Sequence, residues 1–187
     1  MKSRIFNLLI LFIAMSFASF VSAEPQAVNH PINKWMVKGR LGIQTTKGGE
    51  TATFNWLQTK DHYILQIIAP LGAGSAKIIG QPGKVILQTT NPPQTRSASS
   101  PERLLMRNLG WALPISDLFY WIQGLPAPTS AAKIKYNNDK TIEQIVQQGW
   151  VINYLAYARL PKISLPIRIV ITHAKFRVKI LINMWKT

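Results

Sequence analysis

Alternating apolar and polar side chains over residues 35–44 are the feature that most constrains how this chain folds. Trp35, Val37 and Leu41 share one face of an extended segment, whereas Arg40 lies on the other. A two-residue period is typical of a strand with one buried and one solvated face. Similar segments, each separated from the next by a turn, follow at residues 52–56, 63–68, 76–80 and 85–90. The succession predicts an antiparallel meander, and hence a sheet or a barrel.

After the fifth of these segments the strand pattern stops, and two short helices are predicted. Ser100-Pro101-Glu102 supplies an N-cap, a proline at the first helical position and an early acid, so a helix is expected over residues 101–109. Pro114 opens a second helix over residues 116–123, which Gly124 ends as a C-terminal cap. Both helices are rich in large apolar side chains.

Strand patterns then resume at residues 134–136, 141–147, 150–158, 167–172 and 176–185. About ten strands interrupted by two helices predict a mainly β domain. A sheet of this size can curl into an unclosed antiparallel β-barrel, and the two helices would then form a short lid over an apolar cavity.

The large apolar side chains exceed what a tight core beneath two short helices needs, which favours a ligand cavity. Each buried methylene group would contribute about 0.8 kcal/mol, so a long acyl chain could be held without a polar contact. The alternative, that these side chains are ordinary core, stays open. The candidate lining residues are Trp35, Leu41, Phe54, Trp56 and Leu65 from strands, and Leu105, Leu109, Trp121 and Ile122 from the lid.

Pro70-Leu71-Gly72 places a large apolar side chain at the tip of a turn between two strand-like segments. Proline fixes its own φ and glycine frees the chain after it, which is the chemistry of a turn. Turn tips are normally polar and solvated. Leu71 is therefore expected either to fold back onto the core, or to point outward into a lipid or another protein's apolar surface.

The first 23 residues have the pattern of a secretory signal peptide. Lys2 and Arg4 precede a mostly apolar run, and Val21-Ser22-Ala23 places small residues before a cut expected after Ala23. The apolar run is short for a membrane span, and an uncleaved anchor is the alternative. Residues 24–34 are predicted to be a tether and residues 35–187 the folded domain, which would be exported.

Catalytic and metal-binding side chains are sparse. The chain contains no cysteine, which excludes disulfides, thiolate metal sites and a cysteine nucleophile. Its three histidines and seven carboxylates are scattered, and no nucleotide-binding or hydrolase motif occurs. We therefore expect no enzyme, no metal and no cofactor.

The chain is strongly basic, with 22 Lys and Arg against 7 Asp and Glu, and its net charge of +15 becomes +13 without Lys2 and Arg4. Nucleic acid is a common partner for such a charge, but export argues against it. Anionic lipid headgroups attract the same cations. We expect salt-dependent binding to anionic vesicles, since salt at 0.1 M screens charges beyond about 10 Å. A merely soluble basic surface is the alternative.

Over residues 35–185 the order and spacing of several motifs resemble the LolB family of outer-membrane lipoprotein receptors. The resemblance rests on Lys38-Gly39-Arg40-Leu41, Phe54-Asn55-Trp56-Leu57-Gln58, Ala69-Pro70-Leu71-Gly72, Gln81-Pro82-Gly83, Leu113-Pro114-Ile115 and Trp121-Ile122-Gln123-Gly124-Leu125-Pro126. It implies an eleven-stranded unclosed barrel with a helical lid, a cavity for acyl chains and a membrane-contacting loop of Pro70, Leu71 and Gly72.

The resemblance also implies a function. The chain would accept lipoproteins from a periplasmic carrier and promote their insertion into the outer membrane. The expected partners are lipoprotein acyl chains, the carrier protein and the inner leaflet of the outer membrane, and the domain is expected to be a monomer. A soluble periplasmic carrier of lipoproteins or lipids, similar to the LolA family, is the first alternative, and a small membrane-spanning barrel is the second.

One departure from the family pattern concerns attachment. Family members are usually lipoproteins anchored through an N-terminal cysteine, and this sequence has none. The domain is therefore expected at the periplasmic side of the outer membrane or as a soluble periplasmic form, unless its natural start differs from the one given.

Overall fold

Eleven strands form one curved antiparallel sheet in the computed structural model, which describes residues 26–46, 48–109, 113–174 and 176–187. The spatial order is β7-β6-β5-β4-β3-β2-β12-β11-β10-β9-β8, and a short β1 pairs in parallel with β11. The strands are β1 (Gln26–Ala27), β2 (Lys34–Thr45), β3 (Gly48–Thr59), β4 (His62–Ile68), β5 (Ser75–Gln81), β6 (Lys84–Thr90), β7 (Pro93–Ala98), β8 (Ala132–Tyr136), β9 (Ile142–Gln147), β10 (Trp150–Arg159), β11 (Ile163–His173) and β12 (Phe176–Lys186). The predicted signal peptide, residues 1–23, lies outside the described residues.

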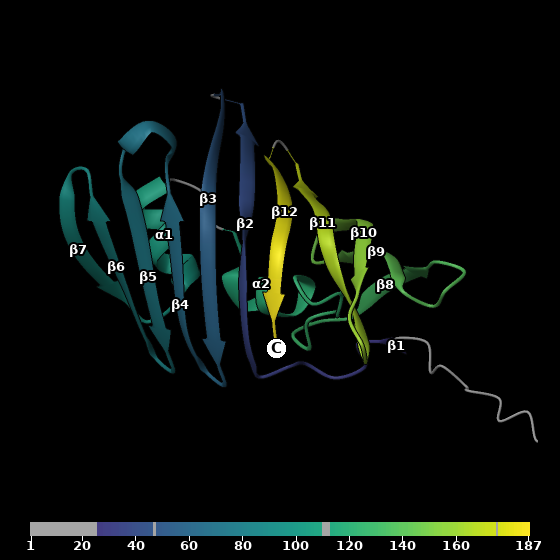
Figure 1. Cartoon of the computed structure of the whole chain (residues 1–187). Coiled ribbons are helices and arrows are strands. Elements are labelled where there is room, and N and C mark those ends of the chain that lie inside the picture. The colour runs from purple at the N-terminus through teal and green to yellow at the C-terminus, as the bar shows by residue number, and fades with distance from the viewer. Residues whose placement is uncertain (1–25, 47, 110–112, 175) are drawn as a thin grey trace, which may run out of the picture.

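The sheet is not closed. Strands β7 and β8 stand at its two ends, and among the described strands they do not pair with each other. Helices α1 (Pro101–Leu109) and α2 (Ile115–Trp121) lie on its concave side, behind the sheet in Figure 1. The predicted fold class, a mainly β unclosed barrel with two short helices, is confirmed.

The register shows why the alternation in β2 is so regular. Gly39 lies opposite Phe54 of β3 and Ile182 of β12, and both partners are buried on the concave side. A Cβ atom at Gly39 would overlap the carbonyl oxygen of Leu181, so only glycine allows β12 to approach this closely. Arg40, the next residue, is exposed on the convex side. The two faces of β2 are thus set by its two-residue period.

Two segments depart from the sequence-based expectation. The strand pattern was expected to stop at residue 91, and this was wrong, because β7 continues the meander as an edge strand beside β6. Five of its six residues are exposed, so neither face requires apolar side chains and no alternation marks it. In the predicted tether, β1 pairs with β11, and Ile32 packs against the core.

An aromatic cluster packs the end of the half-barrel at which β2 begins. The ring centroid of Trp35 lies 5.2 Å from that of Trp56, 5.5 Å from that of Trp185 and 6.1 Å from that of Phe119 in α2. Tyr63 extends the cluster, 6.0 Å from Trp56. Aromatic pairs contribute about 0.5–1.5 kcal/mol beyond area burial, so this end is filled and strongly held.

The predicted start of α1 and the predicted glycine cap after α2 are both observed. The Ser100 hydroxyl accepts a hydrogen bond from the backbone N of Arg103 at 3.3 Å, and α1 has the predicted bounds. Helix α2 starts one residue earlier than predicted and ends two residues earlier, at Trp121. Gly124 then adopts φ +77°, and the backbone N of Leu125 donates to the Tyr120 carbonyl at 3.1 Å. This is the left-handed glycine cap expected there.

Candidate functional site

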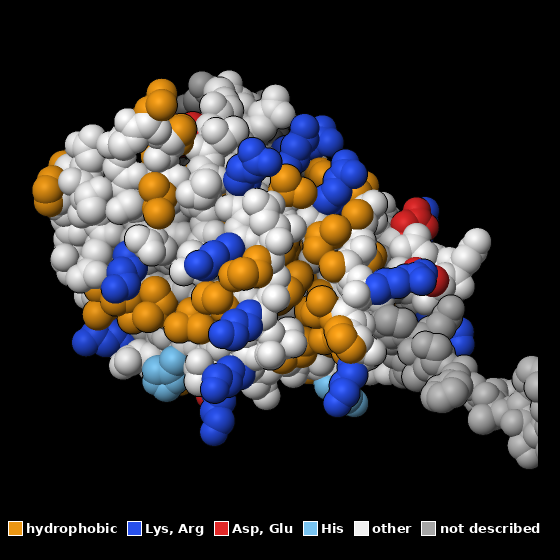
Figure 2. All heavy atoms as spheres, viewed as in Figure 1, with side chains coloured by type: hydrophobic (Ala, Val, Ile, Leu, Met, Phe, Trp, Pro, Cys, Tyr) orange, Lys and Arg blue, Asp and Glu red, His pale blue; other side chains and the backbone are white. Residues whose placement is uncertain are grey.

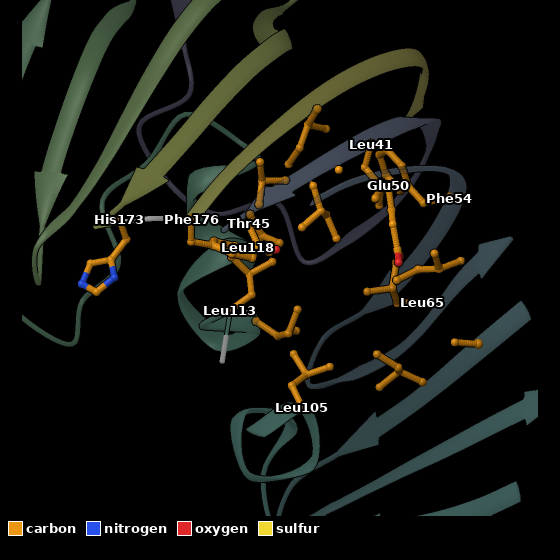
Figure 3. A pocket seen from close by; sticks show the side chains of 18 of the residues that line it. Leu41, Thr45, Glu50, Phe54, Leu65, Leu105, Leu113, Leu118, His173 and Phe176 are labelled. Atoms are coloured by element: carbon orange, nitrogen blue, oxygen red, sulfur yellow. The ribbon is translucent and has the colours of Figure 1, made fainter. Parts of the chain in front are cut away.

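A cavity of about 980 Å³ lies between the concave face of the sheet and the two helices. Its volume is near the upper limit of the roughly 300–1,000 Å³ typical of small-molecule sites. Figure 3 shows side chains converging on it from the strands, among them Leu41, Phe54 and Leu65, and from the helical segment, among them Leu105, Leu113 and Leu118. The lining is predominantly apolar, so the cavity favours an apolar ligand.

Most of the predicted lining residues meet in this cavity. Six of the nine line it: Leu41, Phe54, Trp56, Leu65, Leu105 and Ile122. Trp35 does not, because it sits within the aromatic cluster. Trp121 is also buried outside the lining, where its ring lies 6.0 Å from that of Trp150. Leu109 is the last residue of α1, and its side chain lies outside the described residues. A role of these residues in binding acyl chains stays a prediction.

Sequence reasoning missed part of the lining. On the strands, β12 contributes Phe176, Val178 and Ile180, whose alternation with charged residues was a usable signal. The two helices, the connection between them and the segment that follows α2 cover the cavity, and we call them the roof. Leu113, Ile115 and Leu118 of the roof also line the cavity. Leu113 lies in the connection between the helices, where no period predicts which way a side chain points.

The polar groups of the cavity gather at one end, which we call the rim. Thr45, Thr46 and Glu50 lie in or beside the turn between β2 and β3, and His173 is the last residue of β11 before the turn to β12. Glu50 lies opposite the inward-facing Ile43 of β2, and Figure 3 labels it among the lining side chains. The rim is opposite the aromatic cluster, because β2 and β12 each run from one of these ends to the other. The cavity is therefore polar at the rim and packed with rings at the far end.

The loop with Leu71 lies at the same rim. It forms a 3-10 turn, η1 (Pro70–Gly72), between β4 and β5, at the top of the sheet in Figure 1. The Leu71 side chain is fully exposed. The backbone N of Ala69 donates to the Gly74 carbonyl at 2.9 Å, and Asn91 Nδ2 donates to the Ala73 carbonyl at 3.2 Å. Hydrogen bonds to backbone carbonyls of the loop, and not packing of Leu71, thus hold the turn.

Leu71 is also held in an unfavourable backbone conformation. Its φ of 53° and ψ of 28° lie in the left-handed region, which costs a residue with a Cβ atom about 1–2 kcal/mol. Such a conformation persists only where the surrounding structure imposes it, and it is common at functional sites. Of the two expectations for Leu71, the outward orientation is the one observed, and none of the described residues covers its side chain.

The roof is anchored to the sheet by one buried glutamine. Gln147, at the end of β9, accepts hydrogen bonds through Oε1 from Trp121 Nε1 at 2.9 Å and from the backbone N of Ala127 at 3.0 Å. Its Nε2 donates to the carbonyls of Ala127 and Ser130 at 2.7 and 2.8 Å. All of its hydrogen-bonding capacity is therefore used to fix the segment after α2.

Gln123 similarly joins the roof to the segment that precedes β2. Its Nε2 donates to the Phe119 carbonyl at 2.8 Å, and its Oε1 accepts from the backbone N of Ile32 at 2.8 Å. The Tyr154 hydroxyl donates to the Trp121 carbonyl at 2.8 Å. Burial raises the pKa of Tyr154 well above its ordinary value, so this hydroxyl stays protonated and able to donate. The C-terminal end of α2 is consequently the rigid part of the roof.

The described residues were also compared with the requirements of a metal site and of a membrane-spanning helix. In these ranges, no group of three or more His, Asp or Glu side chains is placed to hold a metal ion. Of the helices described, none has both the length and the apolar composition that crossing a membrane requires.

An antiparallel half-barrel with helices over its concave face and an apolar cavity beneath them defines a binding protein for apolar ligands. Solved structures share this fold at low sequence identity. A LolA superfamily protein from Nitrosomonas europaea superposes with a TM-score of 0.52 at 10% identity, covering 84% of this chain and 87% of that one. A DUF1329 family protein from Desulfovibrio piger gives 0.54 at 8% identity, covering 82% and 85%.

The chain belongs to the LolB family, since residues 33–185 match the family described as "Outer membrane lipoprotein LolB". It is 36% identical over 154 residues to an outer-membrane lipoprotein LolB from Pseudomonas fluorescens, covering 82% of this chain and 75% of the relative. It is 37% identical over 155 residues to the protein of the same name from Chromohalobacter salexigens, covering 83% and 72%. The resemblance seen in the motifs is therefore confirmed, and the family is one of receptors and not of enzymes.

Proposed function

We propose that this chain accepts lipoproteins from a periplasmic carrier, holds their acyl chains in the cavity and inserts them into the outer membrane. The observation that carries the proposal is the position of Leu71. The lining of the cavity extends to the exposed residues of the rim, and the loop that carries the fully exposed Leu71 lies at that same rim. The cavity that would hold the acyl chains and the side chain that would contact the membrane therefore meet at one end of the domain.

The energetics of transfer explain why this proximity matters. Each methylene group gains about 0.8 kcal/mol on leaving water, whether it enters a protein cavity or a bilayer. Transfer between the two is therefore nearly balanced, and the barrier is the exposure of the chain to water on the way. A rim held against the bilayer by Leu71 shortens that exposure, so no covalent chemistry and no external energy source is needed.

Leu71 is suited to touch the membrane in a reversible way. Inserting one leucine side chain into lipid gains about 1.5–3 kcal/mol, which is enough to orient the rim but not to fix the domain permanently. The partners of this function are lipoproteins, the carrier that delivers them and the inner leaflet of the outer membrane, and the domain would act as a monomer on its periplasmic side. The relatives are named outer-membrane lipoproteins; how this chain is held at the membrane is a separate matter from its cavity.

Leu71→Glu tests the proposal. We expect the variant to fold and to take up a lipoprotein from the carrier, because the turn is held by backbone hydrogen bonds and the cavity does not include Leu71. Delivery to liposomes should fail, because a carboxylate is costly to remove from water. The measurements are the melting temperature, cargo binding and transfer of labelled lipoprotein, all on one preparation.

Leu57→Glu is the matched control, because Leu57 is 43% exposed on the convex face near the far end of β3 and away from the rim. It should deliver cargo normally. Normal delivery by the Leu71 variant would contradict the proposal. Cargo uptake by the parent protein without any unaided delivery would instead identify a soluble carrier.

A further inference from the structure

A second hollow, of about 710 Å³, lies on the convex face of the sheet, and we call it the outer groove. It begins at the base of the Leu71 loop, where Ile68 and Pro70 line it, and it crosses β3, β2 and β12 to β11. Gly42 forms its floor, between Thr51 of β3 and Lys179 of β12. Because glycine has no side chain, this outward position of β2 leaves a depression where its neighbours project.

Four cationic side chains surround the outer groove. Arg40 and Arg168 lie in one transverse row, each opposite Leu181 of β12, and so stand about 10 Å apart across two strand spacings. Lys179 and Arg177 follow along β12 toward the rim. All four are exposed. Figure 2 shows Lys and Arg side chains gathered on this face, with apolar side chains between them.

Among the described residues, no acidic side chain balances these cations. The described lining of the outer groove contains no Asp or Glu, and the ion pair between Arg159 and Asp139 involves none of its residues. Four like charges around one hollow repel one another, and an anion between them converts that repulsion into attraction. The guanidinium groups of Arg40, Arg168 and Arg177 also match phosphate oxygens in bidentate geometry. The charge distribution thus calls for a phosphate-bearing ligand.

The remaining lining identifies the class of that ligand. Ile68 is 44% exposed and Leu155 57% exposed, so apolar side chains stand at both ends of the cationic centre. Of the described residues that line the groove, none is aromatic, whereas sites for single-stranded nucleic acid rely on aromatic stacking platforms. A phosphate next to apolar groups is the chemistry of a phospholipid at the surface of a bilayer.

We propose that the outer groove binds the phosphate headgroup of an anionic phospholipid in the membrane leaflet that Leu71 enters. The groove and Leu71 are adjacent, so one leaflet can meet both, with the leucine in the apolar layer and the cations at headgroup depth. This inference rests on the proposed function only in assuming that the domain meets a membrane. Uptake of cargo into the concave cavity does not depend on it.

Filling the groove without altering the fold is the first test. A Cβ atom at Gly42 meets nothing closer than 4.0 Å, and the residue has no left-handed φ, so Gly42→Glu is sterically tolerated. Its carboxylate would take the place of the lipid phosphate among the four cations. Ala131→Glu, at an exposed position before β8, adds the same charge away from the groove and is the matched control.

We expect Gly42→Glu to lower the affinity for vesicles of phosphatidylglycerol and phosphatidylcholine at least tenfold in cosedimentation, and Ala131→Glu to change it less than threefold. Melting temperatures should show that both variants are folded. An equal effect of the two substitutions would overturn the proposal, because it would show that only net charge matters.

Removing cations is the second test. The double variant Arg40→Gln/Lys179→Gln should bind anionic vesicles about 25-fold more weakly, at roughly fivefold for each cation next to an anionic surface. Lys133→Gln/Lys135→Gln, with two exposed lysines of the distant edge strand β8, is the charge-matched control and should bind nearly as the parent does. Equal losses in both double variants, or no loss in either, would contradict a localised headgroup site.

Two further readouts distinguish a headgroup site from a site for free phosphate and from the membrane contact of Leu71. Soluble glycerophosphate should not displace the protein from anionic vesicles at millimolar concentration, whereas displacement would show that free phosphate is the ligand and overturn the proposal. The groove variants should retain cargo uptake, and Leu71→Glu should retain salt-sensitive vesicle binding that depends on Arg40 and Lys179. Failure of the headgroup site would therefore leave the proposed function intact, and the reverse also holds.

Discussion

Glu102 and Ser116 join the two helices of the roof through a single carboxylate oxygen. Glu102 Oε1, in the first turn of α1, accepts hydrogen bonds from both the backbone N of Ser116 at 3.1 Å and its hydroxyl at 3.0 Å. Ser116 lies in the first turn of α2. Both bonds are exposed to solvent, so they orient α1 against α2 while burying little apolar surface.

Glu102→Ala should loosen the roof more than it destabilises the fold. Exposed hydrogen bonds contribute on the order of 1 kcal/mol, so the melting temperature should fall by about 2–4 °C. The rates at which a fluorescent fatty acid enters and leaves the cavity should both rise severalfold in stopped-flow measurements. Glu143→Ala removes an exposed carboxylate from β9 and should leave both rates unchanged. Unchanged rates in the Glu102 variant would show that the two helices move independently of this contact.

Gln147→Ala should be among the most destabilising single substitutions outside the apolar core. It leaves the indole N–H of Trp121 and the backbone N and carbonyl of Ala127 without their partner in a buried place, and the Ser130 carbonyl without its partner in a partly buried one. Each unsatisfied buried group costs about 1–3 kcal/mol, and partial relaxation makes about 3 kcal/mol the expected total. Chemical denaturation measures it, with Gln144→Ala on the same strand as the control. Gln144 bonds Asn153 in a partly buried place, so its loss should cost about 1 kcal/mol or less.

Leu71→Asn separates the backbone strain of the rim loop from its apolar side chain. Asparagine tolerates the left-handed region better than leucine does. The free energy of unfolding of the variant should therefore equal that of the parent or exceed it by up to about 1 kcal/mol, and its melting temperature should be equal or slightly higher. The variant should also deliver less lipoprotein to liposomes. A lower melting temperature would indicate that the Leu71 side chain makes stabilising contacts after all.

Asp139 gives the turn between β8 and β9 a pH-dependent contribution. Its carboxylate accepts hydrogen bonds from the hydroxyl of Thr141 at 2.6 Å and from its backbone N at 3.2 Å, and these lower its pKa below the ordinary 3.8. Because the folded state favours the charged form, the contribution is complete above the unfolded pKa and is lost as pH falls through the folded value. At pH 7 the free energy of unfolding of the wild type should exceed that of Asp139→Asn by about 0.5 kcal/mol, because solvent screens this largely exposed carboxylate, and the two values should converge as pH falls below the folded pKa of Asp139. If the difference in unfolding free energy persisted at low pH, the cause would be the shape of the residue 139 side chain and not its charge.

The strand faces could be predicted because sheet periodicity is strict, whereas the cavity could not be separated from the core. Leu41 and Trp35 share one face of β2, and alternation says only that both point inward. The Trp35 ring contacts other rings and completes a packed cluster. The Leu41 side chain instead lines the cavity, because no opposing side chain fills the space in front of it. That difference depends on what strands distant in sequence supply, and no local pattern contains it.

Polar anchors were harder to recognise than apolar ones. Gln147 lies two residues after Ile145, on the inward face of β9, and a polar residue at an inward position was the available signal. Its partners, Trp121 and Ala127, are 26 and 20 residues away. Leu71 is an intermediate case. Proline and glycine around a leucine are local turn chemistry and predicted the turn, but they left open whether the side chain folds back onto the core or points outward, and only the structure shows it exposed.

The unpaired edges of β7 and β8 have a consequence for the size of cargo. In a closed barrel, strand number and stagger fix the girth of the interior. Here, among the described strands, no ladder joins the two edges, so the sheet can open or tighten its curl without breaking any hydrogen bond between neighbours. The interior capacity is then set by where the roof rests. We therefore expect one sequence to accommodate acyl chains of different length and number.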